Sequence, residues 1–269
     1  MQNISDVVGN QKCTGCSACL NICPVGAITM FPNEEGFLCP DIDSFKCINC
    51  GLCSKVCPII NKTGKGNQYP IPTVYAGWNK NEKVRMKSSS GGVFSALAEY
   101  FLRKKGYICG VAIDTENKLN HTLVSSRKDL EKLRNSKYTQ SNVGEVFKNI
   151  KQLLEADKWV LFTGTPCQAS GLRNYLNKDY KKLLIVEIIC HGVPSPSILN
   201  KYIENIEKEK GMKIRKINFK DKSTGWETYS FTMYCNRKQV FKEKFTENTF
   251  FDGFLNNLYL NKICTSCPF

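Results

Sequence analysis

The sequence has no apolar run long enough to cross a membrane. Its best run, residues 183–189, is interrupted by Glu187 and has the length of a single strand, whereas a membrane span needs about 20 apolar residues. The first residues, MQNISDVVGNQKC, also lack the basic patch and apolar stretch of an export signal. We therefore expect a soluble, cytoplasmic protein without a membrane span.

Histidine is scarce as well, because His121 and His191 are the only two in 269 residues. The chain contains neither the Ser/His/Asp arrangement of a hydrolase nor a GxGxxG fingerprint. These absences argue against hydrolytic chemistry and against a standard dinucleotide-binding fold.

Cysteine, in contrast, is abundant. The chain has 15 cysteines, an odd number, and most of them lie two or three residues from the next. In a reducing cytosol this clustering favours metal ligation over disulfides.

Residues 10–60 contain two copies of one cysteine motif. CTGCSACLNICP at 13–24 matches CINCGLCSKVCP at 47–58, and both copies have the pattern Cys-x2-Cys-x2-Cys-x3-Cys-Pro. The first three cysteines of such a run share a tight loop and converge on one cubane, while the fourth ligates the other cluster. Structural zinc instead needs two well-separated pairs, so the pattern disfavours zinc.

The repeat resembles bacterial two-cluster ferredoxins, which implies two [4Fe–4S] clusters. One cluster takes Cys13, Cys16, Cys19 and Cys57. The other takes Cys47, Cys50, Cys53 and Cys23. Cys39 falls outside the pattern and is expected to be a packed thiol.

The formal charge of +14 would ordinarily suggest a nucleic-acid partner. However, a cubane held by four thiolates carries a net charge of about −2, and the formal count treats these cysteines as neutral. Much of the excess is therefore interpreted as counter-charge to anionic cofactors and acidic redox partners, and no nucleic acid is expected.

The rest of the chain is expected to form a second domain. NKTGKGNQYPIP (61–72) has linker composition, which places a dicluster domain at 1–62, a linker at 63–72 and the second domain at 73–269. The second domain alternates strand and helix patterns, which include a short strand at 74–78 and a buried strand at 183–190. It ends in three antiparallel strand patterns, so the fold class is α+β, a ferredoxin fold followed by a mixed α/β domain.

Four segments of this domain resemble, in order, the family of coenzyme F420 hydrogenase/dehydrogenase beta subunits. They are KSSSGGVFSALAEY, NSKYTQSNVGEVF, VLFTGTPCQASGL and IICHGVPSP. The resemblance implies an oxidoreductase with FAD in the second domain and a third [4Fe–4S] cluster beside it. Family members usually continue well beyond the last Cys-x2-Cys pair, whereas this chain stops two residues after Cys267, which suggests a fragment or a shortened protein.

Two strand-to-helix segments are candidate flavin contacts, because a helix N-terminus offers N–H groups to a phosphate. They contain Ser89, Ser90, Gly91, Gly92, Thr163, Gly164 and Thr165. A capped helix explains the first segment equally well. Lys137 is a candidate for the pyrimidine edge of the flavin, where it would stabilise the reduced anion, and its alternative is a solvated lysine.

Four otherwise unused cysteines are candidate ligands of the third cluster. Cys167 and Cys190 each follow a predicted parallel strand, where the sites of α/β sheets gather, and Cys264 and Cys267 form a Cys-x2-Cys pair. The alternative for the first two is a buried, non-ligating thiol. His191 follows a proposed ligand. It is a candidate for donating a hydrogen bond to a sulfur or for assisting protonation at the flavin, and its alternative is a structural role.

A cluster passes one electron at a time, a hydride carries two, and a flavin handles both. We therefore predict an iron–sulfur flavoprotein that relays electrons between its clusters and FAD, which exchanges a hydride with an organic substrate such as coenzyme F420. Redox partners are expected to be a ferredoxin or a dehydrogenase or hydrogenase subunit. The alternatives are an electron-carrier subunit without its own substrate and a bacterial homologue in polysaccharide biosynthesis.

Overall fold

The computed structural model describes residues 4–9, 11–61 and 71–269, so most of the expected linker at 63–72 lies outside the described residues. The cysteine-rich part, residues 4–61, has three short helices and one hairpin. Its elements are α1 (Ile4–Gly9), α2 (Ala18–Ile22), β1 (Ile28–Pro32), β2 (Leu38–Ile42) and α3 (Leu52–Val56). The two strands pair antiparallel, with Met30 opposite Pro40.

The sequence repeat is also a structural repeat. Helix α2 begins directly after Ser17, which has a φ of 59°, and α3 begins directly after Gly51, which has a φ of 73°. These residues occupy equivalent positions in the two motifs, between the second and third cysteines. Both chain segments therefore turn through the left-handed region before a short helix.

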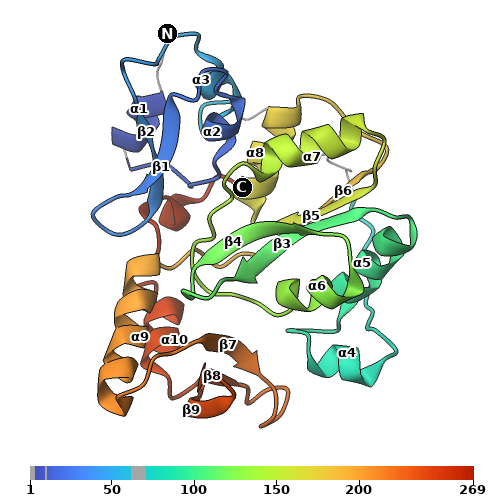
Figure 1. Cartoon of the computed structure of the whole chain (residues 1–269), viewed down its shortest axis with the longest axis vertical. Coiled ribbons are helices and arrows are strands. Elements are labelled where there is room, and N and C mark those ends of the chain that lie inside the picture. Colours follow the sequence, from blue (N-terminus) through green and yellow to red (C-terminus); the bar gives the residue numbers. More distant parts are fainter. Residues whose placement is uncertain (1–3, 10, 62–70) are drawn as a thin grey trace.

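A four-stranded sheet with the order β4-β3-β5-β6 forms the centre of the second part. Strands β3, β5 and β6 run parallel, and β4 pairs antiparallel with β3 at one edge. The strands are β3 (Tyr107–Ile113), β4 (Leu119–Val124), β5 (Val160–Gly164) and β6 (Leu183–Glu187). Helix α4 (Glu82–Met86) precedes this sheet, and helices cover both of its faces (Figure 1).

The central strand β5 shows why both faces are covered. Phe162 packs in a core cluster with residues of α7 (Val146–Glu155) and α8 (Pro166–Leu176). Its neighbour Leu161 packs on the other face, with residues of α5 (Val93–Arg103) and α6 (Arg127–Leu133). Because successive side chains of a strand point to opposite faces, this apolar strand requires a helical layer on each side.

Two of the expected strands differ in the structure. Residues 74–78 form no strand, and Val74 and Tyr75 are 85% and 87% exposed. The expected buried strand at 183–190 ends at Glu187 and is an edge strand, with Ile189 fully exposed. Apolar composition alone suggested a central position, but β6 has a neighbour on one side only.

The C-terminal part is a second, antiparallel sheet of three strands in the order β7-β8-β9. Its elements are α9 (Pro196–Lys210), β7 (Lys216–Asp221), β8 (Ser230–Cys235), β9 (Lys238–Lys244), α10 (Thr249–Leu255) and a 3-10 helix at Lys262–Ser266. The expected run of antiparallel strands is therefore confirmed. Its core is aromatic, with the rings of Phe219 and Phe231 stacked at 5.0 Å.

The cysteine-rich part is anchored to the rest of the chain by buried contacts. Asn21 of α2 donates to the Gly144 carbonyl at 2.7 Å and accepts from the Lys148 N–H at 3.1 Å. The chain returns to this part at its C-terminal end, where Asn261 donates to the Cys13 carbonyl at 3.2 Å (Figure 1). Within the described residues, no helix combines the length and apolarity needed to cross a membrane.

Candidate metal centres

The first group of thiols lines a small cavity between α1, α2, the hairpin and the segment that follows α3. Its cysteines are Cys13, Cys16, Cys19 and Cys57. Burial raises the pKa of Cys16 to about 11 and raises that of Cys19 as well. Thiols in such surroundings ionise readily only when a cation is bound beside them, which is the role of iron in a cluster site.

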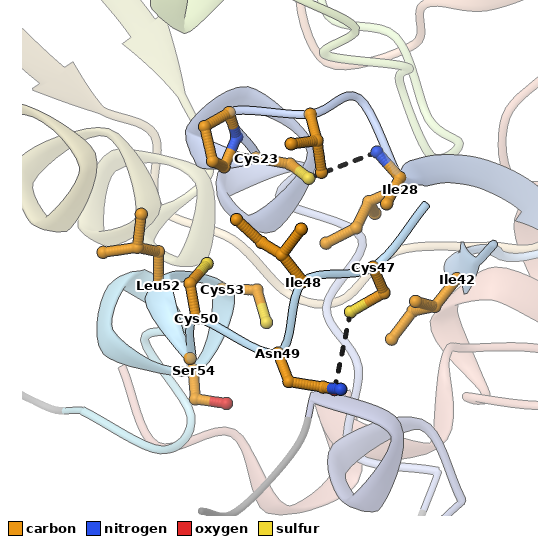
Figure 2. Close-up of a pocket in the computed structure, with 14 residues that line it drawn as sticks. Cys23, Ile28, Ile42, Cys47, Ile48, Asn49, Cys50, Leu52, Cys53 and Ser54 are labelled. Atoms are coloured by element: carbon orange, nitrogen blue, oxygen red, sulfur yellow. Dashed lines mark hydrogen bonds between the residues drawn. The ribbon is translucent and has the colours of Figure 1, made fainter. Parts of the chain in front are cut away.

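The second group surrounds a larger cavity of about 350 Å³. Its cysteines are Cys23, Cys47, Cys50 and Cys53. Figure 2 shows Cys23 on one side of this cavity and the 47–53 segment, which supplies the other three, on the other. Each group thus contains three cysteines of one repeat and the last cysteine of the other, the same two sets that the motif spacing implies.

Both groups fit a cubane better than a single ion. The ligands of one zinc ion converge on one tetrahedral centre, whereas the four thiolates of a cubane bind four different irons. In the described part of the chain, no group of three or more His, Cys, Asp or Glu side chains is placed to hold one metal ion. Their role as cluster ligands stays a prediction.

Backbone N–H groups already point at two of these sulfurs. Gly15 donates to Cys13 Sγ at 3.4 Å, and Ala27 donates to Cys23 Sγ at 3.2 Å. Gly15 has a φ of 69°, and a Cβ there would lie 2.2 Å from Gln140 Nε2. Glycine therefore permits both the tight ligand loop and its close contact with the second part of the chain.

A third group of thiols gathers where the chain returns to the cysteine-rich part. Cys167 lies in the first turn of α8, Cys190 follows β6, and Cys264 and Cys267 lie in or just after the 3-10 helix. Burial, together with the neighbouring thiols of Cys16, Cys190 and Cys264, raises the pKa of Cys167 to about 12. Cys167 is thus close to both the first group and the third.

Cys39 has a partner that the sequence did not suggest. Its thiol hydrogen-bonds with Cys13, and this contact is the largest cause of the raised pKa of Cys13. The same contact lowers the pKa of Cys39. Cys39 is partly buried, as expected of a packed thiol. It nevertheless lies directly beside Cys13, a proposed ligand.

The segment Ser89–Gly92 is tied to the residues just before Lys137. Ser89 Oγ donates to Asn135 Oδ1 at 2.7 Å and accepts from the Ser136 N–H at 2.5 Å. Gly92 precedes α5 with a φ of 79°, and Ser90 is exposed. Two candidate flavin contacts, Ser89–Gly92 and the segment that leads to Lys137, are therefore adjacent.

Lys137 is not a solvated lysine. Its ammonium donates to the carbonyls of Leu133 at 3.0 Å and Arg134 at 2.7 Å, at the C-terminal end of α6, and to Lys132. A cation is favourable at this end of a helix. Burial nevertheless lowers the pKa of Lys137 to about 7, so it can exchange its proton near neutral pH.

The hydroxyls of Thr163 and Thr165 are both used inside the protein. Thr163 Oγ1 donates to the Cys109 carbonyl at 3.1 Å, and Thr165 Oγ1 lies 3.1 Å from Cys167 Sγ. Gly164, between them, packs against the ring of Phe162. Thr165 therefore contacts a candidate ligand of the third thiol group, while the Thr163 hydroxyl is engaged by the backbone of β3. The role of this segment as a flavin contact stays a prediction.

His191 is exposed and fixed by one polar contact. Its Nε2 lies 2.8 Å from Asn257 Oδ1, and its ring meets the edge of Phe254 at 5.0 Å. It directly follows Cys190, as the sequence shows, and its proposed role at the flavin stays a prediction.

Three family descriptions match the chain in order. Residues 12–60 match a 4Fe-4S dicluster domain. Residues 74–148 match the N-terminal part of the coenzyme F420 hydrogenase/dehydrogenase beta subunit, and residues 157–269 match its C-terminal part. The chain belongs to this family of beta subunits. The resemblance inferred from the four sequence segments is thereby confirmed, as is a mixed α and β fold with an N-terminal 4Fe-4S domain.

One relative of this F420 hydrogenase/dehydrogenase family member is a subunit of the F420H2 dehydrogenase of Methanosarcina mazei. It is 26% identical over 245 residues, which cover 80% of this chain and 64% of the relative. The chain thus spans 64% of the length of that protein. A chain in a solved structure of the F420-reducing [NiFe] hydrogenase complex of Methanosarcina barkeri is 17% identical, with a TM-score of 0.46, and the match covers 74% of this chain and 68% of that one.

A buried polar network in this F420 hydrogenase/dehydrogenase family member was missed by sequence analysis. His121 Nδ1 lies 3.2 Å from Ser141 Oγ, which accepts from Gln168 Nε2 at 3.1 Å. Gln168 Oε1 in turn accepts from the Thr165 N–H at 3.0 Å. The sequence did carry one sign of this, because Thr165 and Gln168 have the spacing of a capping box.

The burial of His121 predicts a loss of stability in mild acid. Burial lowers its pKa to about 4, and the charge of Lys137 adds to this effect. The unfolded chain takes up a proton below its ordinary pKa of about 6.5, whereas the folded chain does so only near 4. Between these values the free energy of unfolding should fall by about 1.4 kcal/mol per pH unit from this group.

The measurement is urea unfolding of the wild type and His121→Phe at about pH 6.5 and about pH 5.5, followed by far-UV circular dichroism. The aromatic replacement keeps a ring on Phe162, which His121 stacks upon at 5.6 Å. The wild type should lose more stability than the variant between the two pH values. Equal losses would show that another group is responsible.

Proposed function

We propose that this chain is an iron–sulfur flavoprotein oxidoreductase that relays single electrons through three [4Fe–4S] clusters. At the end of this relay, beyond the third cluster, a bound FAD would exchange a hydride with an organic substrate such as coenzyme F420. A flavin supplies this chemistry because it exchanges both single electrons and hydrides. The proposal assigns residues 1–62 to a dicluster ferredoxin domain and 73–269 to the flavin and third-cluster domain.

The observation that carries the proposal is the position of Cys167. It lies in the first turn of α8, and Cys16 of the first thiol group packs in one core cluster with Ala169 and Leu172 of the same helix. The thiols of Cys190 and Cys264 in the third group are near enough to raise its pKa. The second group lies in the same N-terminal part as the first, and the two share the α2–α3 contact. These contacts support a continuous series of three clusters, as a relay of single electrons requires.

We place the flavin at Ser89–Gly92 and Lys137. The support is the direct bonding of these two segments through Asn135 and Ser136, together with the free N–H groups at the start of the 11-residue helix α5. The Lys137 ammonium, which the carbonyls of Leu133 and Arg134 hold in place, is a positive group that would balance the charge of a reduced ligand. Thr165, which contacts Cys167, is assigned to the third cluster instead.

The test is anaerobic purification followed by iron, sulfide and flavin analysis. Three clusters predict about twelve irons per chain, with one FAD, and turnover of reduced F420 with a one-electron acceptor dye. About eight irons without flavin would contradict the proposal. About twelve irons without flavin or turnover would instead indicate an electron-carrier subunit without its own substrate.

A further inference from the structure

Thr165 makes a direct polar contact with one proposed ligand of the third cluster. Its Oγ1 lies 3.1 Å from Cys167 Sγ, and Thr165 is the N-cap residue directly before helix α8. We propose that the Thr165 hydroxyl donates a hydrogen bond to the Cys167 thiolate and raises the reduction potential of the third cluster. This inference rests on the proposed function, because it takes Cys167 as a ligand.

The direction of the hydrogen bond follows from chemistry. A cysteine that binds a metal is a thiolate and has no proton to give, so the hydroxyl must be the donor. The contact with Cys167 is the one hydrogen bond of the Thr165 hydroxyl within the described residues. Its proton is therefore available to the sulfur.

The buried network of Gln168, Ser141 and His121 holds the backbone of Thr165 in position. Gln168 accepts from the Thr165 N–H at 3.0 Å and donates to Ser141 at 3.1 Å. Ser141 contacts the ring of His121 at 3.2 Å. Gln168, Ser141 and His121 are each 6% exposed, so these contacts exchange little with water and restrict the segment to one arrangement.

The effect on the cluster has a definite sign. Reduction adds one negative charge, which is shared with the ligand sulfurs, and a hydrogen bond to a sulfur stabilises that charge. Cys167 also lies in the first turn of α8, where the partial positive charge of the helix acts in the same direction. Both contributions favour the reduced cluster, so losing the hydroxyl should make its potential more negative.

The experiment compares Thr165→Val with Thr165→Ser. Valine keeps the shape of threonine without the hydroxyl, and serine keeps the hydroxyl. Cluster potentials are measured by anaerobic redox titration followed by electron paramagnetic resonance, and the third-cluster signal is identified by its absence in Cys190→Ser. In T165V one potential should become more negative, while T165S should stay near the wild-type value.

A second readout detects the proton itself. Electron–nuclear double resonance of the reduced third cluster before and after transfer to heavy water should show an exchangeable proton in the wild type and T165S that is missing in T165V. Loss of the third cluster in T165V alone would also support the hydroxyl contact.

Unchanged potentials in T165V, or an equal shift in both variants, would overturn the inference. Wild-type protein with only about eight irons would instead overturn the third cluster, and with it the proposed function.

Discussion

Replacing Cys57 by alanine should remove the same cluster as replacing Cys16, although the two residues belong to different repeats. The physical reason is that Cys57 lines the cavity of the first group, at the end of α3, and not the cavity lined by Cys50 and Cys53. In both variants iron should fall from about twelve to about eight per chain. The low-temperature paramagnetic spectra of the two reduced variants should match.

The controls make this result specific. Cys50→Ala should remove the other cluster and give a different residual spectrum. Cys39→Ala should keep about twelve irons, because Cys39 lines neither cavity, although it can shift a potential through its contact with Cys13. A C57A spectrum that matches C50A would show that each repeat holds its own cluster.

The loss of the first cluster should also unfold the N-terminal part. Cys57 packs with Ile4, Val7, Cys19 and Ile28 in the apolar cluster of this part. So small a unit buries too little apolar surface to be stable without metal ligands or other crosslinks. Limited proteolysis of C57A should therefore cleave within residues 4–61, whereas the sheet around β5 should resist.

Local sequence patterns predicted the N-terminal part well because its structure follows ligand spacing. Two identical runs of cysteine and proline leave few ways to place four sulfurs, and Ser17 and Gly51 turn at equivalent points. The strand expected at 74–78 does not form. The strand expected at 183–190 forms over 183–187, but it is shorter and less buried than expected, because apolar composition does not show which strands lie beside it. Ile189 is apolar and yet fully exposed, since β6 is an edge strand.

The candidate sites show the same limit. The third thiol group was predictable in outline, because residues that follow parallel strands gather at one edge of a sheet. The contact of Thr165 with Cys167 was not, because it depends on the side-chain rotamer of Thr165. Lys137 was interpreted as either a flavin contact or a solvated residue, and its contacts with the end of α6 depend on how the chain folds back after that helix.

Replacing Cys190 by serine should remove the third cluster and leave the other two intact. Cys190 lies outside both N-terminal cavities, and its electrostatic partner is Cys267 at the C-terminal end. Iron should fall to about eight per chain, with the dicluster spectrum unchanged. Cys235→Ser is the matched control, because Cys235 pairs with Lys238 in the β8–β9 hairpin, away from every thiol group.

The same variant separates the two halves of the proposed relay. Reduction of the N-terminal clusters by dithionite should proceed as in the wild type, while turnover of reduced F420 with an acceptor dye that takes electrons from those clusters should fall to background. The reason is that a flavin can pass electrons onward one at a time only to a nearby acceptor, and Cys167 links the third thiol group to Cys16. If C190S kept the full iron content and turnover of the wild type, the link between the flavin and the N-terminal clusters would have to lie elsewhere in the fold.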